Sequence, residues 1–160
     1  MTTRTFAAWV EPLAERFGEN RRAVLDFARA LPPQAWELAS PLEGWTYRDI
    51  LAHLGAGNYK SVQAVLRAVI TRTPFDPALF ADDNAQNARN VAERRGRSVD
   101  ELIAELEADK EEIQDLLSQL KAEDEGLSQA GYDVTLGQAL PFFAAHDLEH
   151  LEHLRSALEG

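Results

Sequence analysis

The stretch TLGQALPFFAAHDLEHLEHLRSALEG, residues 135–160, predicts the fold of this 160-residue chain most directly. Its apolar residues recur every three or four positions, which is the spacing of one buried face of an amphipathic helix. Thr135, followed three residues later by Gln138, is a capping-box pattern that predicts where the helix begins. Pro141 lies in the second turn, so the helix is expected either to kink there or to become regular nearby. The expected buried face comprises Leu140, Phe143, Leu151, Leu154 and Leu158.

Three other long segments have the same helical spacing of apolar residues. They are residues 5–31, 46–71 and 98–122. Between the last two, the polar and alanine-rich residues 82–96 predict a further helix with little to bury. No segment shows the alternation of apolar and polar residues that is typical of a strand. The sequence therefore predicts an all-α fold, a four-helix bundle with a long connection between the second and third helices, in one domain spanning residues 1–160.

The composition is that of an ordinary globular protein and limits the possible chemistry. The chain has no cysteine, which rules out disulfides, thiolate metal ligands and a protein thiol nucleophile. A metal would have to bind through nitrogen and oxygen, and thiol chemistry would need a thiol from outside. The net charge of −11 argues against nucleic acid as a partner. We expect no membrane partner, because no apolar run approaches the roughly 20 residues that span a bilayer. We expect a cytoplasmic location, because no signal peptide is recognisable.

Three of the four histidines lie in one octet, HDLEHLEH, residues 146–153. His146 and His150 are four residues apart, so on a helix they point the same way from adjacent turns and can chelate one ion. Around that helix, His150 lies about 60° and His146 about 100° from the centre of the apolar face. His153 lies further out, two turns from His146, and is not expected to share its metal. The metalloprotease pattern HExxH is excluded because Asp147 occupies the position of its glutamate.

The fourth histidine, His53, lies near the apolar face of the second predicted helix. Gly55 and Gly57 follow it, although glycine in a helix interior costs about 1 kcal/mol relative to alanine. Either open space for a ligand beside His53 or close packing of two helices would explain both glycines. Three neutral imidazoles from two helices would form a metal site with open positions for water or substrate. The alternative is that the octet is a surface face whose histidines pair with neighbouring acids.

Two motifs resemble the DinB-like superfamily, which includes the N-terminal domains of mycothiol-dependent maleylpyruvate isomerases. They are GWTYRDILAHL, residues 44–54, and FFAAHDLEHLEHLR, residues 142–155. The family pattern is a Gly-Trp-Ser/Thr segment that opens the second helix, a histidine within that helix, and a His-x-x-x-His pair on the last one. The resemblance extends over nearly the whole chain. It implies a four-helix bundle with a crossed-over topology and a divalent metal, commonly zinc or nickel, held by His53, His146 and His150.

The same resemblance implies an activity. Several members are thiol-dependent transferases or isomerases that use mycothiol, bacillithiol or a related low-molecular-weight thiol, and homodimers are common. We therefore expect a small-molecule thiol or substrate as partner, a metal that lowers the pKa of the thiol, and attack of the thiolate on an electrophilic carbon. The alternatives are a non-catalytic metal-binding or stress-response module, and a helical interaction protein with surface histidines.

Two departures from the family pattern limit this expectation. His153 stands where relatives often carry glutamine, so we expect it at the rim of the site or behind the ligands. The chain ends at Gly160 without the second domain of the maleylpyruvate isomerases, so their particular substrate is not carried over. Trp45 is expected to anchor the core at the start of its helix rather than to line a pocket. Candidate polar residues for the pocket are Asn58, Tyr59, Asn84, Asn87 and Arg89.

Overall fold

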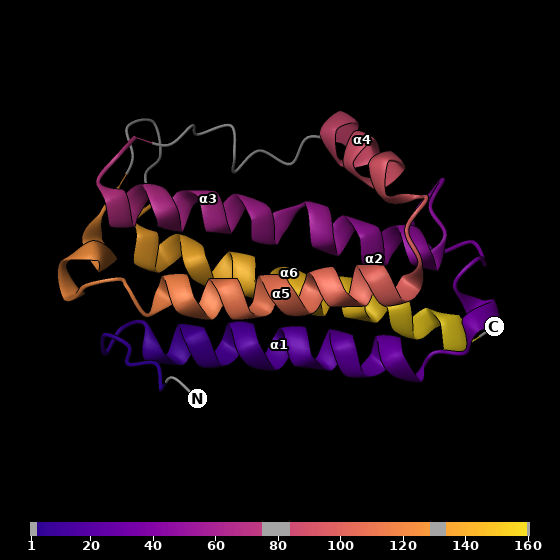
Figure 1. The fold of residues 1–160 in the computed structure, drawn as a ribbon, viewed down its shortest axis with the longest axis horizontal. Coiled ribbons are helices and arrows are strands. Elements are labelled where there is room, and N and C mark those ends of the chain that lie inside the picture. The colour runs from indigo at the N-terminus through magenta and orange to yellow at the C-terminus, as the bar shows by residue number, and fades with distance from the viewer. Residues whose placement is uncertain (1–2, 75–83, 129–133, 160) are drawn as a thin grey trace.

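The computed structural model describes residues 3–74, 84–128 and 134–159, and it forms a bundle of four helical rods (Figure 1). The rods are α1 (Glu11–Ala30), α2 (Tyr47–Ala56) continued by α3 (Asn58–Thr71), α5 (Val99–Leu117) and α6 (Leu136–Arg155). Short 3-10 turns occupy Pro33–Ala35, Ala122–Gly126 and Ser156–Leu158. The described residues contain no strand, and none of their helices is long and apolar enough to cross a lipid bilayer. The predicted all-α class is confirmed.

The direction of the rods requires a long connection along the bundle. α1 and α6 run one way, whereas α2, α3 and α5 run the opposite way (Figure 1). Because α3 and α5 are consecutive rods that run in parallel, the chain must return between them. That return contains α4 (Asn84–Arg94), which packs against α2 and buries Val91. The predicted long second-to-third connection and the crossed-over topology are confirmed.

Three helices begin at the capping boxes that the sequence contains. At the start of α2, the Asp49 amide donates to Thr46 Oγ1 over 3.2 Å, and the Thr46 amide donates to the Asp49 carboxylate over 3.1 Å. The same reciprocal bonds open α5 and α6, between Ser98 and Glu101 and between Thr135 and Gln138. Each box provides acceptors for N–H groups that have no partner within the helix. Local chemistry therefore determines where these helices start.

Several helix boundaries differ from the prediction, among them the ends of α5 and α6, which are Leu117 and Arg155. α1 begins at Glu11 rather than near residue 5, because Pro12 fits the first turn of a helix but has no amide hydrogen to donate to a preceding turn. The predicted helix over residues 46–71 is interrupted at Gly57, whose backbone angles of φ −94° and ψ −107° are not helical. Pro141, by contrast, lies inside α6 without ending it. The interruption at Gly57 separates the helix that carries His53 from the rest of its rod.

The core consists of two apolar clusters with buried polar side chains between them. One cluster lies where α1 and α6 begin, and the other lies where these two helices end. Between the clusters lie Asn20 and Arg21 of α1, Asp109 of α5 and Asp147 of α6, all of them buried. We call these four residues the central polar layer. Since burying an unpaired charge is costly, the layer has to be paired internally or with its neighbours.

The charges of the central polar layer are paired. Arg21 donates to both carboxylate oxygens of Asp147, over 2.6 and 2.9 Å, and its guanidinium lies 3.6 Å from the centroid of the Tyr59 ring. Burial disfavours the charged form of Arg21, but the attraction and hydrogen bonds of Asp147 raise the pKa of the guanidinium above its ordinary value. Asp109 accepts a hydrogen bond of 2.6 Å from Lys60 of α3. The two-pronged bond between Arg21 and Asp147 fixes α1 against α6.

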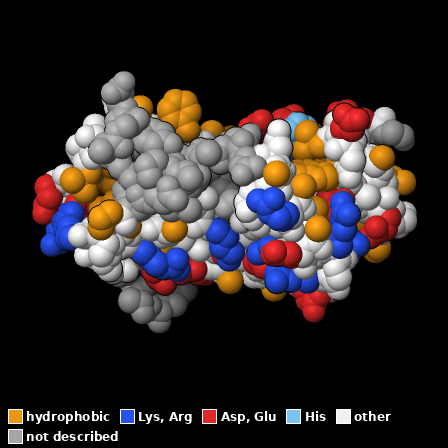
Figure 2. Space-filling model, turned by 90° about the horizontal axis from the view of Figure 1, so that it is seen from above, with side chains coloured by type: hydrophobic (Ala, Val, Ile, Leu, Met, Phe, Trp, Pro, Cys, Tyr) orange, Lys and Arg blue, Asp and Glu red, His pale blue; other side chains and the backbone are white. Residues whose placement is uncertain are grey.

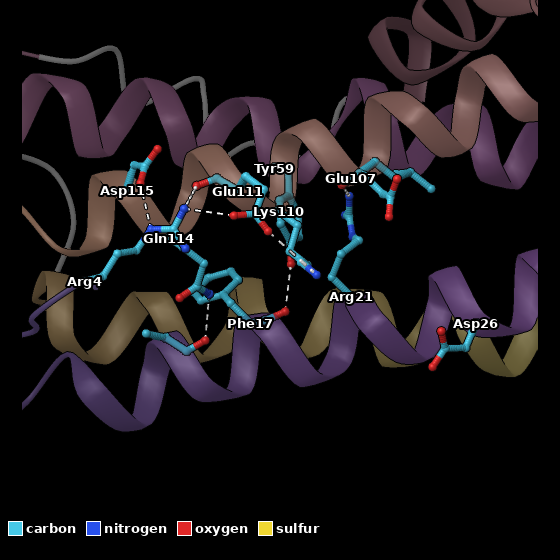
Figure 3. A network of polar contacts seen from close by, with 12 residues as sticks. Arg4, Phe17, Arg21, Asp26, Tyr59, Glu107, Lys110, Glu111, Gln114 and Asp115 are labelled. Atoms are coloured by element: carbon cyan, nitrogen blue, oxygen red, sulfur yellow. Dashed lines mark hydrogen bonds and ion pairs between the residues drawn. The ribbon is translucent and has the colours of Figure 1, made fainter. Parts of the chain in front are cut away.

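Further bonds from side chains to backbone hold α1 in register with its neighbours. Asn20 donates to a backbone carbonyl of α6 over 2.8 Å. Figure 3 shows the side of α1 that faces α3 and α5, where the Tyr59 hydroxyl donates to the Phe17 carbonyl over 3.2 Å. Nearby, Gln114 of α5 donates to another α1 carbonyl over 2.8 Å. Directional bonds therefore add to apolar packing in placing α1.

Replacing Arg21 with methionine should destabilise the protein by about 3–5 kcal/mol, because the Asp147 carboxylate would stay buried without its partner. The double variant Arg21→Met/Asp147→Leu should recover most of this loss, since it removes both charges. Urea unfolding followed by circular dichroism measures the free energy of unfolding of each variant.

The matched control is Arg155→Ala, which removes an exposed ion pair with Glu152 whose N···O distance is 2.6 Å. It should cost no more than about 1 kcal/mol, because water screens exposed pairs. Equal losses for Arg21→Met and Arg155→Ala would contradict the structural role given to the buried pair.

Candidate metal centre

Helices α2 and α6 contact each other and carry the histidines of the candidate site. His53 lies in the middle of α2, one turn after the fully buried Ile50. On α6, His146 and His150 lie about 100° and 60° to the same side of Asp147 around the helix. Because Asp147 points into the bundle and binds Arg21, the rotation of α6 is set, and with it the direction of both histidines.

The described residues contain one group of three potential metal-binding side chains that are close enough to share an ion: His53, His146 and His150. One ring nitrogen of each lies within 4.8 Å of the others. His146 Nε2 and His150 Nε2 are 3.1 Å apart. Two nitrogens bound to one zinc ion at about 2.0–2.1 Å, at a tetrahedral angle, lie about 3.3 Å apart. The α6 pair is close to that spacing, and a ring nitrogen of His53 lies within 4.8 Å of both.

Burial keeps the His150 imidazole in the neutral form that binds metals. His53 is 5% exposed and His150 is 7% exposed, whereas His146 is half-buried. Desolvation, followed by the proximity of His146, His53 and His153, lowers the pKa of His150 to about 2. His150 is therefore neutral at pH 7 and offers a nitrogen lone pair. The expectation that His150 is the more inward of the α6 pair is confirmed.

The two glycines after His53 are explained by close contact rather than by open space. A Cβ atom on Gly57 would lie 3.2 Å from Cε1 of His53 and 3.1 Å from its carbonyl oxygen. A Cβ atom on Gly55 would lie 2.5 Å from a carboxylate oxygen of Glu105. Gly57 therefore leaves room for the His53 ring, and Gly55 lets α5 approach α2. Gly55 thus fits the expected close packing of two helices, whereas the close contacts of Gly57 are with His53 of its own rod.

Trp45 has two roles in the structure. It is half-buried and packs against the apolar cluster at the end of α1, as expected for a core anchor. Its ring centroid also lies 5.1 Å from that of His53, at an interplanar angle of 43°. Trp45 therefore also forms one wall of the histidine site, although the sequence favoured a core anchor over a pocket wall.

The structure places the polar residues proposed for the pocket in different surroundings. Tyr59 is fully buried and donates to the Phe17 carbonyl, so its assignment to the pocket was wrong. Asn84 and Arg89 are exposed on α4, and Asn87 is half-buried there. The side chain of Asn58 lies outside the described part of the structure. None of these residues belongs to the group of three described histidines.

His153 lies closer to the site than its position on the helical wheel indicated. It is half-buried, and its Nδ1 lies 3.3 Å from Nδ1 of His150. As expected, it does not belong to the group of three. Its contact with His150 was missed, although the spacing of three residues places the two on neighbouring turns. Figure 2 shows a histidine at the surface beside acidic and hydrophobic side chains. His146 and His153 are both half-buried, so the histidine cluster is partly exposed.

Comparisons with known proteins agree with this architecture. Residues 17–154 match the family model described as the mycothiol maleylpyruvate isomerase N-terminal domain. Comparison with curated protein sequences gives no match. The crystal structure of the mycothiol-dependent maleylpyruvate isomerase matches with a TM-score of 0.73 at 15% identity, and that of a histidine-to-alanine mutant of this enzyme with 0.74 at 14%. Both matches cover 91% of this chain, which spans 60% of the length of the solved chains.

The family match covers most of the chain, including His53, His146 and His150. The structural matches extend over nearly all of the bundle and confirm the expected DinB-like fold. The chain belongs to the mycothiol maleylpyruvate isomerase N-terminal domain family.

Proposed function

We propose that the chain binds one divalent metal ion, zinc or nickel, through His53, His146 and His150, and that it catalyses transfer or isomerisation with a small thiol as co-substrate. The observation that carries this proposal is the convergence of three imidazoles from two helices, with ring nitrogens within 4.8 Å of one another. The donor set suits zinc and nickel, which accept imidazole ligands. Three protein ligands leave coordination positions for water or substrate, as in catalytic rather than structural sites.

The thiol is proposed from what the matching structures are described as using. The chain has no cysteine, so if the reaction uses a sulfur nucleophile, another molecule must supply it. Both matching structures are described as a mycothiol-dependent enzyme, which supports a low-molecular-weight thiol as the class of partner. A divalent ion in the site would act as a Lewis acid and lower the pKa of a thiol in its open position. The maleylpyruvate substrate is not assigned to this chain, which spans 60% of the relatives' length.

The protein side chains would hold and orient the reactants. His53 and His150 are buried in the bundle, whereas His146 is half-buried and is the most exposed of the three. A thiol would therefore approach past His146. The Trp45 ring, beside His53, offers an apolar wall for a small substrate and excludes water from that side of the site.

A second function, a metal-binding module without catalysis, is favoured by one observation. Asp147, next to His146 in the sequence, is fully engaged by Arg21 and cannot serve as an acid or base at the site. Catalysis would then rely on the metal, the thiol and the histidines themselves. The two functions differ in whether a thiol reaches the metal.

Protein prepared without a polyhistidine tag should bind one zinc or nickel ion per chain in equilibrium dialysis. His150→Ala should abolish this binding, because His150 is the more deeply buried ligand of the α6 pair. His153→Ala should still bind one ion at saturating metal, since His153 does not belong to the group of three. Full occupancy of His150→Ala, or an empty wild-type protein, would contradict the proposed metal centre.

Thiol binding can be tested on the cobalt-substituted protein. Mycothiol, bacillithiol and glutathione should be titrated separately, and at least one should produce the absorption of a cobalt–sulfur bond, because cobalt substitutes for zinc with similar ligands. The control is the same titration with serine, whose hydroxyl replaces the sulfur. A cobalt absorption spectrum that none of the three thiols changes would favour the metal-binding module without catalysis.

A further inference from the structure

The octet contains a histidine that the proposed metal centre does not use. His153 Nδ1 lies 3.3 Å from His150 Nδ1, and the two ring centroids are 5.3 Å apart. On its other side, His150 Nε2 lies 3.1 Å from His146 Nε2. The His150 ring therefore has a metal-facing nitrogen at one edge and a nitrogen in contact with His153 at the other.

A histidine that binds a metal normally donates its second ring N–H to a fixed acceptor. That bond holds the ring in one tautomer and one orientation, so that the other nitrogen keeps its lone pair for the ion. A carboxylate or a backbone carbonyl is the usual acceptor. If Nε2 of His150 faces the ion, then Nδ1 must carry the hydrogen, and the atom in front of it is Nδ1 of His153.

The acidic residues of the octet are bound elsewhere or face solvent. Both carboxylate oxygens of Asp147 accept from Arg21. Glu149 is exposed. Glu152 is exposed and forms an ion pair with Arg155. An imidazole thus occupies the position where other metal sites use a carboxylate.

The backbone of His153 is itself held in place. Its carbonyl accepts a hydrogen bond of 2.6 Å from the Ser156 hydroxyl. The same hydroxyl lies 2.9 Å from the hydroxyl of Tyr47, the first residue of α2. These contacts connect the end of α6 to the start of the helix that carries His53. The backbone of His153 is therefore anchored, and its half-buried ring lies against the ring of His150.

We infer that His153 is a positioning residue, which accepts a hydrogen bond from His150 Nδ1–H and thereby aims His150 Nε2 at the metal. The inference rests on the proposed metal centre, and it adds a fourth histidine that acts through another residue. His153 keeps its own hydrogen on Nε2. Its effect is on the affinity for the ion and not on the number of ions bound.

The first test compares metal affinities in competition with a chromophoric zinc chelator. His153→Phe keeps an aromatic ring but has no acceptor, and it should bind zinc about 10–100-fold more weakly with one ion still bound at saturation. His153→Gln offers a carboxamide oxygen and should stay close to wild type. Glu152→Gln, an exposed neighbour, is the control and should not change the affinity. Wild-type affinity in His153→Phe, or equal weakening in both His153 variants, would overturn the inference.

The second test needs no metal. Nitrogen-15 spectra of metal-free protein labelled in histidine should show the His150 hydrogen on Nδ1 in the wild type and in His153→Gln, and a mixture of tautomers in His153→Phe. A wild-type hydrogen on Nε2 would overturn the role of His153. A wild type with the expected tautomer but no affinity for zinc or nickel would instead overturn the proposed metal centre, so the two failures can be told apart.

Discussion

The buried ion pair between Arg21 and Asp147 is the constraint on which the rest of the structure depends. Apolar packing alone would let α6 rotate or slide, since leucine faces tolerate many registers. A two-pronged bond between two side chains that are both 0% exposed admits one arrangement. It lies between the two apolar clusters and joins the first helix to the last. Such a pair adds little net stability, because desolvation offsets the attraction, but it selects one packing over its alternatives.

The position of the histidine site follows from the pairing of Arg21 with Asp147. Once Asp147 points at Arg21, His146 and His150 must lie on the side of α6 that faces α2. The interruption at Gly57 ends α2 one turn after His53 and leaves room for its ring. The histidines of α6 thus lie next to Asp147 of the central polar layer, and two of the three proposed ligands, His53 and His150, are buried. Helix α6 both stabilises the bundle and positions two of the proposed ligands, so a change in the packing of α6 would also change the site.

Most of the fold that could be predicted from the sequence came from local patterns, namely helix caps and the spacing of apolar residues. The cap at Thr135 predicted one helix start, two other helices begin next to residues 46 and 98 as their segments predicted, and the apolar spacing indicated all four rods. The pairing of Arg21 with Asp147 was not predictable, because the residues are 126 positions apart and each alone resembles a surface residue. The i,i+4 spacing indicated His146 with His150. His53 was proposed as the third ligand from its place near the apolar face of the second predicted helix, and the family resemblance implied the same three residues. The contact between His150 and His153 was within reach of the same helical argument and was overlooked.

The central claim is that three imidazole nitrogens bind one ion. X-ray absorption of the zinc-loaded protein tests it most directly, because it counts the scattering atoms around the metal and distinguishes imidazole from other ligands. The account predicts three imidazoles at about 2.0–2.1 Å together with one or two lighter oxygen ligands, and two imidazoles in His53→Ala. A zinc ion surrounded by oxygen atoms alone, or a spectrum that His53→Ala leaves unchanged, would contradict it.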